Sequence, residues 1–278
     1  MKLTIKILFC YTTLLMLSCT TPSVRLEDQA KQLGFTQHQH VSNRFLLTIF
    51  NNKPLCKNNK LNVYIAGDGR PWRNHTQIAL DPTPNHLLVL DLMSLDSEAS
   101  IYLGRPCYHG QHQSVACQPL YWTHWRYSPT VVDSMVAALQ HHLKPHPACT
   151  ITLIGYSGGG TLAMLIAPKL TNTHRVITIS GNLDVDAWTK HHNYSPLKGS
   201  LNPATEPALP STIQQMHLIG NADDNIPANL VLPSLDSQVN PMILRYPNVD
   251  HRCCWTSIWP DILQRLDLED SPANPSID

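Results

Sequence analysis

The stretch "ITLIGYSGGGTLAMLIA", residues 151–167, passes from a β-branched apolar run through glycines that flank Ser157 and into a helix-like run. A sharp strand-to-helix turn lifts a serine hydroxyl clear of a sheet, and flanking glycines allow that backbone without side-chain clashes. The stretch therefore predicts that Ser157 is a nucleophile. The pattern G-x-S-x-G also arises by chance at ordinary glycine and serine frequencies, so the rest of the chain must decide.

Strand-like and helix-like segments alternate along the chain, and most of the strand-like ones are continuous apolar runs, as in strands that are covered on both faces. The predicted strands are 44–50, 61–67, 100–104, 149–156, 175–180, 215–220 and 241–246, and the predicted helices are 128–143, 160–167 and 255–266. Residues 86–96 fit either a strand or a helix by periodicity, and their place between two strands favours a crossover helix. This order predicts an α/β fold, with a mainly parallel central sheet and helices on both faces.

An acid and a base follow the serine, each after a further predicted strand. Asp223 and Asp224 follow "HLIG", and His251 follows the last predicted strand. Each has an ordinary alternative, since aspartates are common in turns and the chain holds 15 histidines. The order of serine, aspartate and histidine, each beyond a successive strand, favours a catalytic triad.

At these residues the chain resembles the α/β-hydrolase superfamily. Ser157 in "GYSGG" matches the family's nucleophile elbow, and His251 in "DHRCCW" matches the position of its base. Asp223 in "GNADDNIP" matches the acid loop, because Asp223 and not Asp224 has two residues between itself and Ile-Pro. The likeness covers about residues 43–266, and "YIAGDGRPW", "YLGRPC" and "WTHWRYSP" are similar to uncharacterised bacterial lipoprotein members. It implies an α/β-hydrolase fold with a short cap segment.

The resemblance implies a serine hydrolase that cleaves a carboxylic ester or thioester through an acyl-enzyme, and it leaves peptidase activity open. His251 would accept the serine proton, and Asp223 would orient the imidazole. The backbone N–H groups of Gly158 and Asp68 would form the oxyanion hole, with Gly69 as the alternative donor to Asp68. The turn "GDG" is equally compatible with selection for its backbone shape alone.

The segment expected to form the cap, residues 181–207, is short and polar, which favours a small or moderately sized ester as substrate. Trp188 and Tyr194 fit either the wall of an acyl pocket or packing under this loop. Arg126 fits either binding of a substrate carboxylate or pairing with a structural one.

The composition excludes some other function classes. The formal charge of +0, from 20 Lys+Arg and 20 Asp+Glu, gives no basic face for nucleic acid. The histidine and cysteine spacings match no zinc motif, and the glycines around Ser157 lack the lysine of a phosphate-binding loop, so no metal and no cofactor are predicted. The alternative to an enzyme is a catalytically inactive hydrolase-fold lipoprotein that serves as an envelope binding or structural module. The sequence does not set the oligomeric state.

The N-terminus has the pattern of an export signal. Lys2 and Lys6 precede an apolar run that is too short to span a bilayer. We expect a lipoprotein signal peptide at 1–18, cleavage before Cys19 and lipidation of Cys19, with ordinary signal cleavage or an uncleaved anchor as alternatives. Residues 19–42 are then a tether and N-terminal segment, and 43–278 a single hydrolase domain. The expected location is the bacterial cell envelope, lipid-anchored, with the outer membrane facing the periplasm favoured over the inner membrane.

Cysteine usage agrees with export, since six of the 8 cysteines fall after Cys19. Cys107 and Cys117 flank the loop "CYHGQHQSVAC", and they are expected either to pair across it or to be two independently buried thiols.

Overall fold

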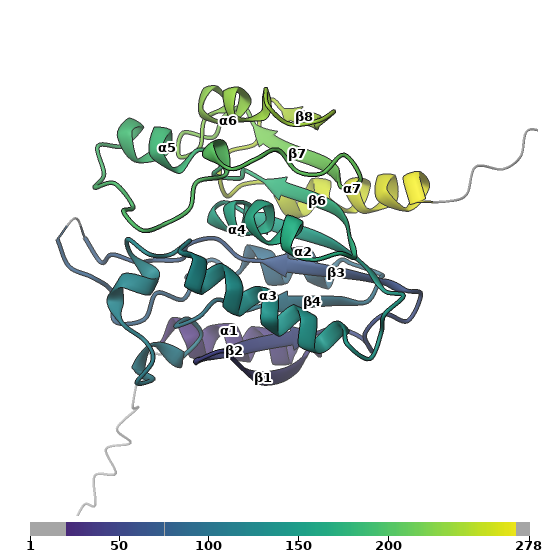
Figure 1. Cartoon of the computed structure of the whole chain (residues 1–278), viewed down its shortest axis with the longest axis horizontal. Helices are drawn as coiled ribbons and strands as arrows, with labels where there is room; N and C mark the ends of the chain where they lie inside the picture. The colour runs from purple at the N-terminus through teal and green to yellow at the C-terminus, as the bar shows by residue number, and fades with distance from the viewer. Residues whose placement is uncertain (1–20, 75, 271–278) are drawn as a thin grey trace, which may run out of the picture.

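The computed structural model describes residues 21–74 and 76–270. Its centre is an eight-stranded sheet in the order β1-β2-β4-β3-β5-β6-β7-β8 (Figure 1). The strands are β1 (Thr36–Ser42), β2 (Phe45–Asn51), β3 (Lys60–Ile65), β4 (Ser100–Leu103), β5 (Thr150–Tyr156), β6 (Thr173–Ile179), β7 (Gln214–Gly220) and β8 (Met242–Tyr246). β1 and β2 pair antiparallel, β2 pairs antiparallel with β4, and all further pairs are parallel. The predicted, mainly parallel α/β architecture is confirmed.

Helices cover both faces of the sheet. The α-helices are α1 (Pro22–Gln32), α2 (Leu88–Ser94), α3 (Pro129–Leu143), α4 (Gly158–Ile166), α5 (Val185–His191), α6 (Ala228–Leu235) and α7 (Trp255–Asp270). Two core clusters divide the buried side chains: one contains residues of α3, α4 and α6, and the other contains residues of α1, α2 and α7. In Figure 1, α3 and α4 lie on the viewer's side of the sheet. Because both faces are covered, most positions of β3, β5, β6 and β7 are buried, as their continuous apolar runs predicted.

Local sequence signals account for two of the helices. Ser128 is the N-cap of α3 and accepts a hydrogen bond from the N–H of Val131, with Pro129 in the first turn. The ambiguous run 86–96 contains the helix α2, which the connection between parallel strands requires.

The fold begins before residue 43, where the sequence led us to place the start of the domain. α1 and β1 occupy most of the segment expected as a tether, and β1 extends the sheet by pairing with β2. β1 was missed because "TQHQHVS" is polar and mostly exposed, as an edge strand permits. α5 and α6 were also missed; α6 holds an internal proline, Pro233, that masks its helical pattern.

Three cysteine pairs are joined in the structure. Cys107 is bonded to Cys117, the pairing considered from the sequence, and Cys56 is bonded to Cys149 across 93 residues. The adjacent Cys253 and Cys254 form the third bond, just beyond His251. Within residues 21–74 and 76–270, no helix is long and apolar enough to cross a membrane. The expected signal peptide and Cys19 lie outside the described residues.

Candidate active site

Ser157 sits on a tight turn between β5 and α4. Its backbone has φ 54° and ψ −123°, an uncommon conformation for a residue with a side chain. The neighbouring glycines are required because the turn leaves no room for a side chain there. A Cβ on Gly155 would lie 2.2 Å from the carbonyl oxygen of Gly159, and a Cβ on Gly159 would lie 2.1 Å from the carbonyl oxygen of Ile65. The turn predicted from the glycines is therefore present.

The structure brings Ser157, His251 and Asp223 into one chain of polar contacts. Nε2 of His251 lies 3.1 Å from the Ser157 Oγ, and Nδ1 lies 2.8 Å from Oδ2 of Asp223. A proton on Nδ1 is donated to the carboxylate, which leaves the lone pair on Nε2 facing the serine hydroxyl. This is the geometry expected of a nucleophile, a base and an acid.

Neighbouring groups fix the Asp223 carboxylate and the backbone of His251. Asp223 is only 3% exposed, and its Oδ1 accepts hydrogen bonds from the N–H groups of Asn225 and Ile226. The hydroxyl of Tyr156 donates to the carbonyl oxygen of His251, 2.9 Å away. Asp224, the alternative acid in the same turn, is exposed.

Asn225 is a site residue to which the sequence assigned no role. Its side-chain Nδ2 lies 3.0 Å from Nε2 of His251, the nitrogen that also faces Ser157. The backbone carbonyl oxygen of Asn225 lies 2.7 Å from Nε2 of His192. The ring of His192 stacks on Tyr194 in the segment after α5. Asn225 therefore links the acid loop, the base and the cap segment. It lies inside the quoted acid loop, but no spacing rule identifies its amide.

The two expected oxyanion donors lie beside the serine. Gly158 follows Ser157 as the first residue of α4, so its N–H has no acceptor within the helix. The turn containing Asp68 follows β3, and a Cβ on the preceding Gly67 would lie 3.1 Å from the Ser157 Cβ. A Cβ on Gly158 would lie 2.2 Å from Oδ1 of Asp68, so the Asp68 side chain packs directly on the elbow. The sequence did not anticipate this use of the side chain.

The Asp68 carboxylate is held between two arginines. Its Oδ1 accepts from Arg105 at 2.7 Å, and its Oδ2 accepts from Arg126 at 2.9 Å and from the Tyr127 hydroxyl at 2.6 Å. Burial opposes ionisation of Asp68, but the guanidiniums of Arg126 and Arg105 outweigh it and lower the pKa of Asp68 to about 2. Asp68 is therefore the structural carboxylate with which Arg126 pairs.

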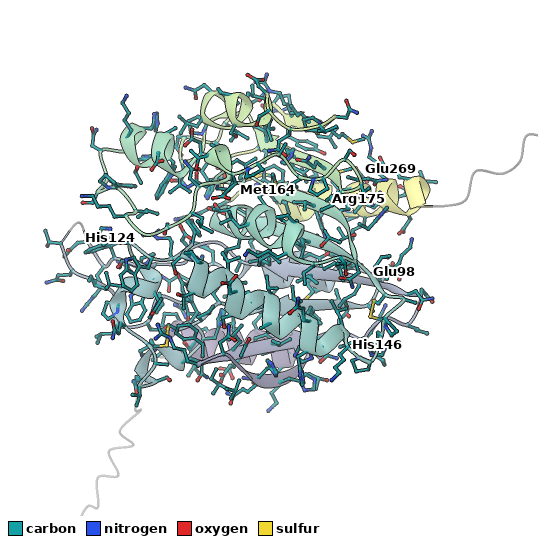
Figure 2. All side chains as sticks on the ribbon, in the orientation of Figure 1. Glu98, His124, His146, Met164, Arg175 and Glu269 are labelled. Carbon is teal, nitrogen blue, oxygen red and sulfur yellow. A yellow bond between two sulfur atoms is a disulfide. The ribbon has the colours of Figure 1, made fainter. Side chains whose placement is uncertain are left out.

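A cleft of about 1170 Å³ opens onto Ser157 and His251. Trp188 and Tyr194 both line it and contact each other, with ring centroids 5.3 Å apart. His124 also lines the cleft and lies at the end of the molecule towards which the parallel strands point, whereas Glu98 and His146 lie at the opposite end (Figure 2). The site thus lies at the carboxyl edge of the sheet, where α/β folds gather their ligands. In the described part of the chain, no group of histidine, cysteine or acidic side chains could hold a metal ion.

Solved structures similar to this one share its arrangement of helices and strands. An esterase of Pyrococcus furiosus is 12% identical, with a TM-score of 0.60 over 86% of this chain and 91% of its own. An α/β serine hydrolase without a lid from Xanthomonas campestris is 14% identical, with a TM-score of 0.55 over 87% and 97% of the two chains. Est1E of Butyrivibrio proteoclasticus, solved with ferulic acid bound, is 13% identical, with a TM-score of 0.59 over 84% and 98%.

The chain has the α/β-hydrolase fold. At these identities the likeness establishes the fold and not the reaction. No family model matches the sequence, and no curated protein matches it.

Proposed function

We propose that this protein is a serine hydrolase that cleaves carboxylic esters or thioesters through an acyl-enzyme. The observation that carries the proposal is the unbroken contact chain from Ser157 through His251 to Asp223, with the serine on a strained elbow that lines a cleft. The fold shared with esterases agrees with it. A binding module would have no chemical need for all three side chains in this register.

The reaction starts when Ser157 attacks the substrate carbonyl while Nε2 of His251 takes the hydroxyl proton. The Asp223 carboxylate holds the tautomer in which Nδ1 carries the proton, and it stabilises the imidazolium that forms. His251 then returns its proton to the leaving alcohol or thiol. In the second half, His251 takes a proton from water as the water attacks the acyl carbonyl. It returns that proton to the Ser157 Oγ as the acyl–oxygen bond breaks and the carboxylic acid leaves.

The N–H groups of Gly158 and Asp68 are proposed to bind the oxyanion that develops during attack. The Asp68 side chain supports this role, because its bonds to Arg105, Arg126 and Tyr127 fix the turn that carries the Asp68 N–H.

Labelling with a fluorophosphonate probe tests the proposal, because such probes react with activated serines. We expect one label on Ser157, loss of label in Ser157→Ala, and hydrolysis of p-nitrophenyl acetate that the same substitution abolishes. A folded protein that neither takes the label nor hydrolyses the ester contradicts the proposal.

We further propose that the domain works in the bacterial cell envelope, anchored through a lipidated Cys19 in the outer membrane and facing the periplasm. The basis is the signal-like sequence of 1–18 and the cysteine that follows it. Metabolic labelling with a palmitate analogue tests this: incorporation should be lost in Cys19→Ser and retained in the matched control Cys10→Ser. Absence of label in the native chain contradicts the anchor.

A further inference from the structure

Arg105, Asp68 and Arg126 form an unequal charge cluster in the cleft wall. Two guanidiniums share one carboxylate, so the cluster carries one uncompensated positive charge. Arg105 and Arg126 are 2% and 4% exposed. Because so little water reaches the cluster, its excess charge is poorly screened.

Arg126 is the member of the cluster that reaches substrate space. It lines the cleft, whereas Arg105 does not. Its Nε donates to the carbonyl oxygen of Thr123 and its Nη1 donates to Asp68. Nη2 has no hydrogen-bond partner among the residues that the structure describes, and it is not one of the fully buried polar atoms. One end of a positioned guanidinium is therefore left to hydrogen-bond to what enters the cleft.

The cleft wall around Arg126 adds no acidic side chain that would neutralise the excess positive charge of the cluster. The cleft residues of the stretches 66–74 and 124–126 include Arg70 and His124, and their only acidic side chain is Asp68. Rings of Trp72 and His124, 6.2 Å apart, join the two stretches. The acidic side chains Asp224 and Asp250 belong instead to the loops that carry Asp223 and His251.

We propose that Nη2 of Arg126 binds a carboxylate carried by the ester substrate, so that the enzyme prefers anionic esters to neutral ones. This inference rests on the proposed hydrolase function. The cluster is close to the reacting atoms, because Asp68, which bonds Arg126, packs on the residue after the nucleophile. Arg126 thus both pairs with a structural carboxylate and offers a second face to a substrate carboxylate.

Matched ester pairs test the inference, with the carboxylate on either side of the scissile bond. The pairs are para-acetoxybenzoate against para-acetoxybenzamide, and monoethyl glutarate against its neutral amide. In at least one pair we expect kcat/KM to favour the anion about tenfold to hundredfold at low salt, as for a hydrogen bond to a charged group. Added NaCl should reduce that ratio only modestly, because the buried charges of the cluster are poorly screened.

Arg126→Gln should bring the ratio to about one, because Asp68 then pairs with Arg105 alone and the cluster is neutral. The ratio is taken within one variant, so a general loss of activity cancels. If this variant fails to fold, Arg126→Lys replaces it: an ammonium bound to Asp68 has no second donor in a fixed plane, and the ratio should fall several-fold. Arg252→Gln, which removes a cleft arginine next to His251, should leave the ratio unchanged.

A wild-type ratio near one in both pairs, with neutral esters still hydrolysed, overturns the inference and leaves the proposed function standing. A ratio that survives loss of the Arg126 guanidinium, or that falls as much in Arg252→Gln, also overturns it. Failure of every ester together with failure of Ser157 to label overturns the proposed function itself.

Discussion

Asp223 and Asp68 are two carboxylates near one cleft, each in the loop after a parallel strand, and their partners differ. Asp223 follows β7 and bonds His251, whose imidazole is proposed to take the serine proton. Asp68 follows β3 and bonds two arginines, which stay charged. In the proposed mechanism the partner decides the role: a carboxylate on an imidazole supports proton transfer, and a carboxylate between guanidiniums supports a fixed wall.

The largest expected effect separates Asp223 from its neighbour. Asp223→Asn should lower kcat by about 10⁴, the size of this effect in serine proteases, because an amide favours the wrong imidazole tautomer. The free energy of unfolding should change little, because the side-chain oxygen of the asparagine still accepts hydrogen bonds from the N–H groups of Asn225 and Ile226. Asp224→Asn, in the same turn but exposed, should cost about tenfold at most. Steady-state kinetics and melting curves on both variants check this, and a dead Asp224→Asn with an active Asp223→Asn would move the acid role to Asp224.

The matching change at the other carboxylate should act on stability. Asp68→Asn leaves two buried guanidiniums without their counter-charge, and we expect a loss of about 3–5 kcal/mol in the free energy of unfolding. Urea unfolding of Asp68→Asn beside Asp223→Asn measures it. Equal stability of the two variants would remove the distinction between wall and catalytic carboxylate.

Low pH should reduce the stability that the Asp68 cluster contributes, within a defined pH range. The pKa of Asp68 is lowered from 3.8 to about 2 in the fold, so its ionised form stabilises the protein above pH 3.8 and the benefit disappears as pH falls towards 2. The shift corresponds to about 2 kcal/mol. The stability gap between wild type and Asp68→Asn should narrow over that window, and a gap that is constant from pH 5 to about 2 would contradict the ionised cluster.

The smallest effect concerns Asn225. Removing its amide in Asn225→Ala takes one hydrogen bond from the His251 ring, and we expect kcat to fall about tenfold, because a misplaced base transfers protons poorly. KM should change less than kcat. Asn221→Ala, at an exposed position of the same acid loop, is the matched control. An unchanged kcat in Asn225→Ala would show that Asp223 alone holds the imidazole.

The sequence predicted one of these two carboxylates better than the other. Ser157, Asp223 and His251 each follow a strand-like run, and they occur in the order that the family has. Their positions along the chain were therefore enough to predict them. Arg105 and Arg126 lie 37 and 58 residues from Asp68, and no periodicity ties positions so far apart. For the same reason Asp68 was expected to act through its N–H alone. Apolar periodicity predicted the fold. The prediction failed where that signal is weak, in the polar edge strand β1 and in α6 with its internal Pro233.

The central claim is that Ser157 forms the acyl-enzyme. Rapid-quench mass spectrometry of the Ser157 peptide during turnover of p-nitrophenyl acetate measures that intermediate directly. We predict one acetyl group on Ser157, formed as fast as the first equivalent of p-nitrophenol is released, and its absence in Ser157→Ala and His251→Ala. Turnover without acetyl on Ser157, or with acetyl on another residue, would contradict the account.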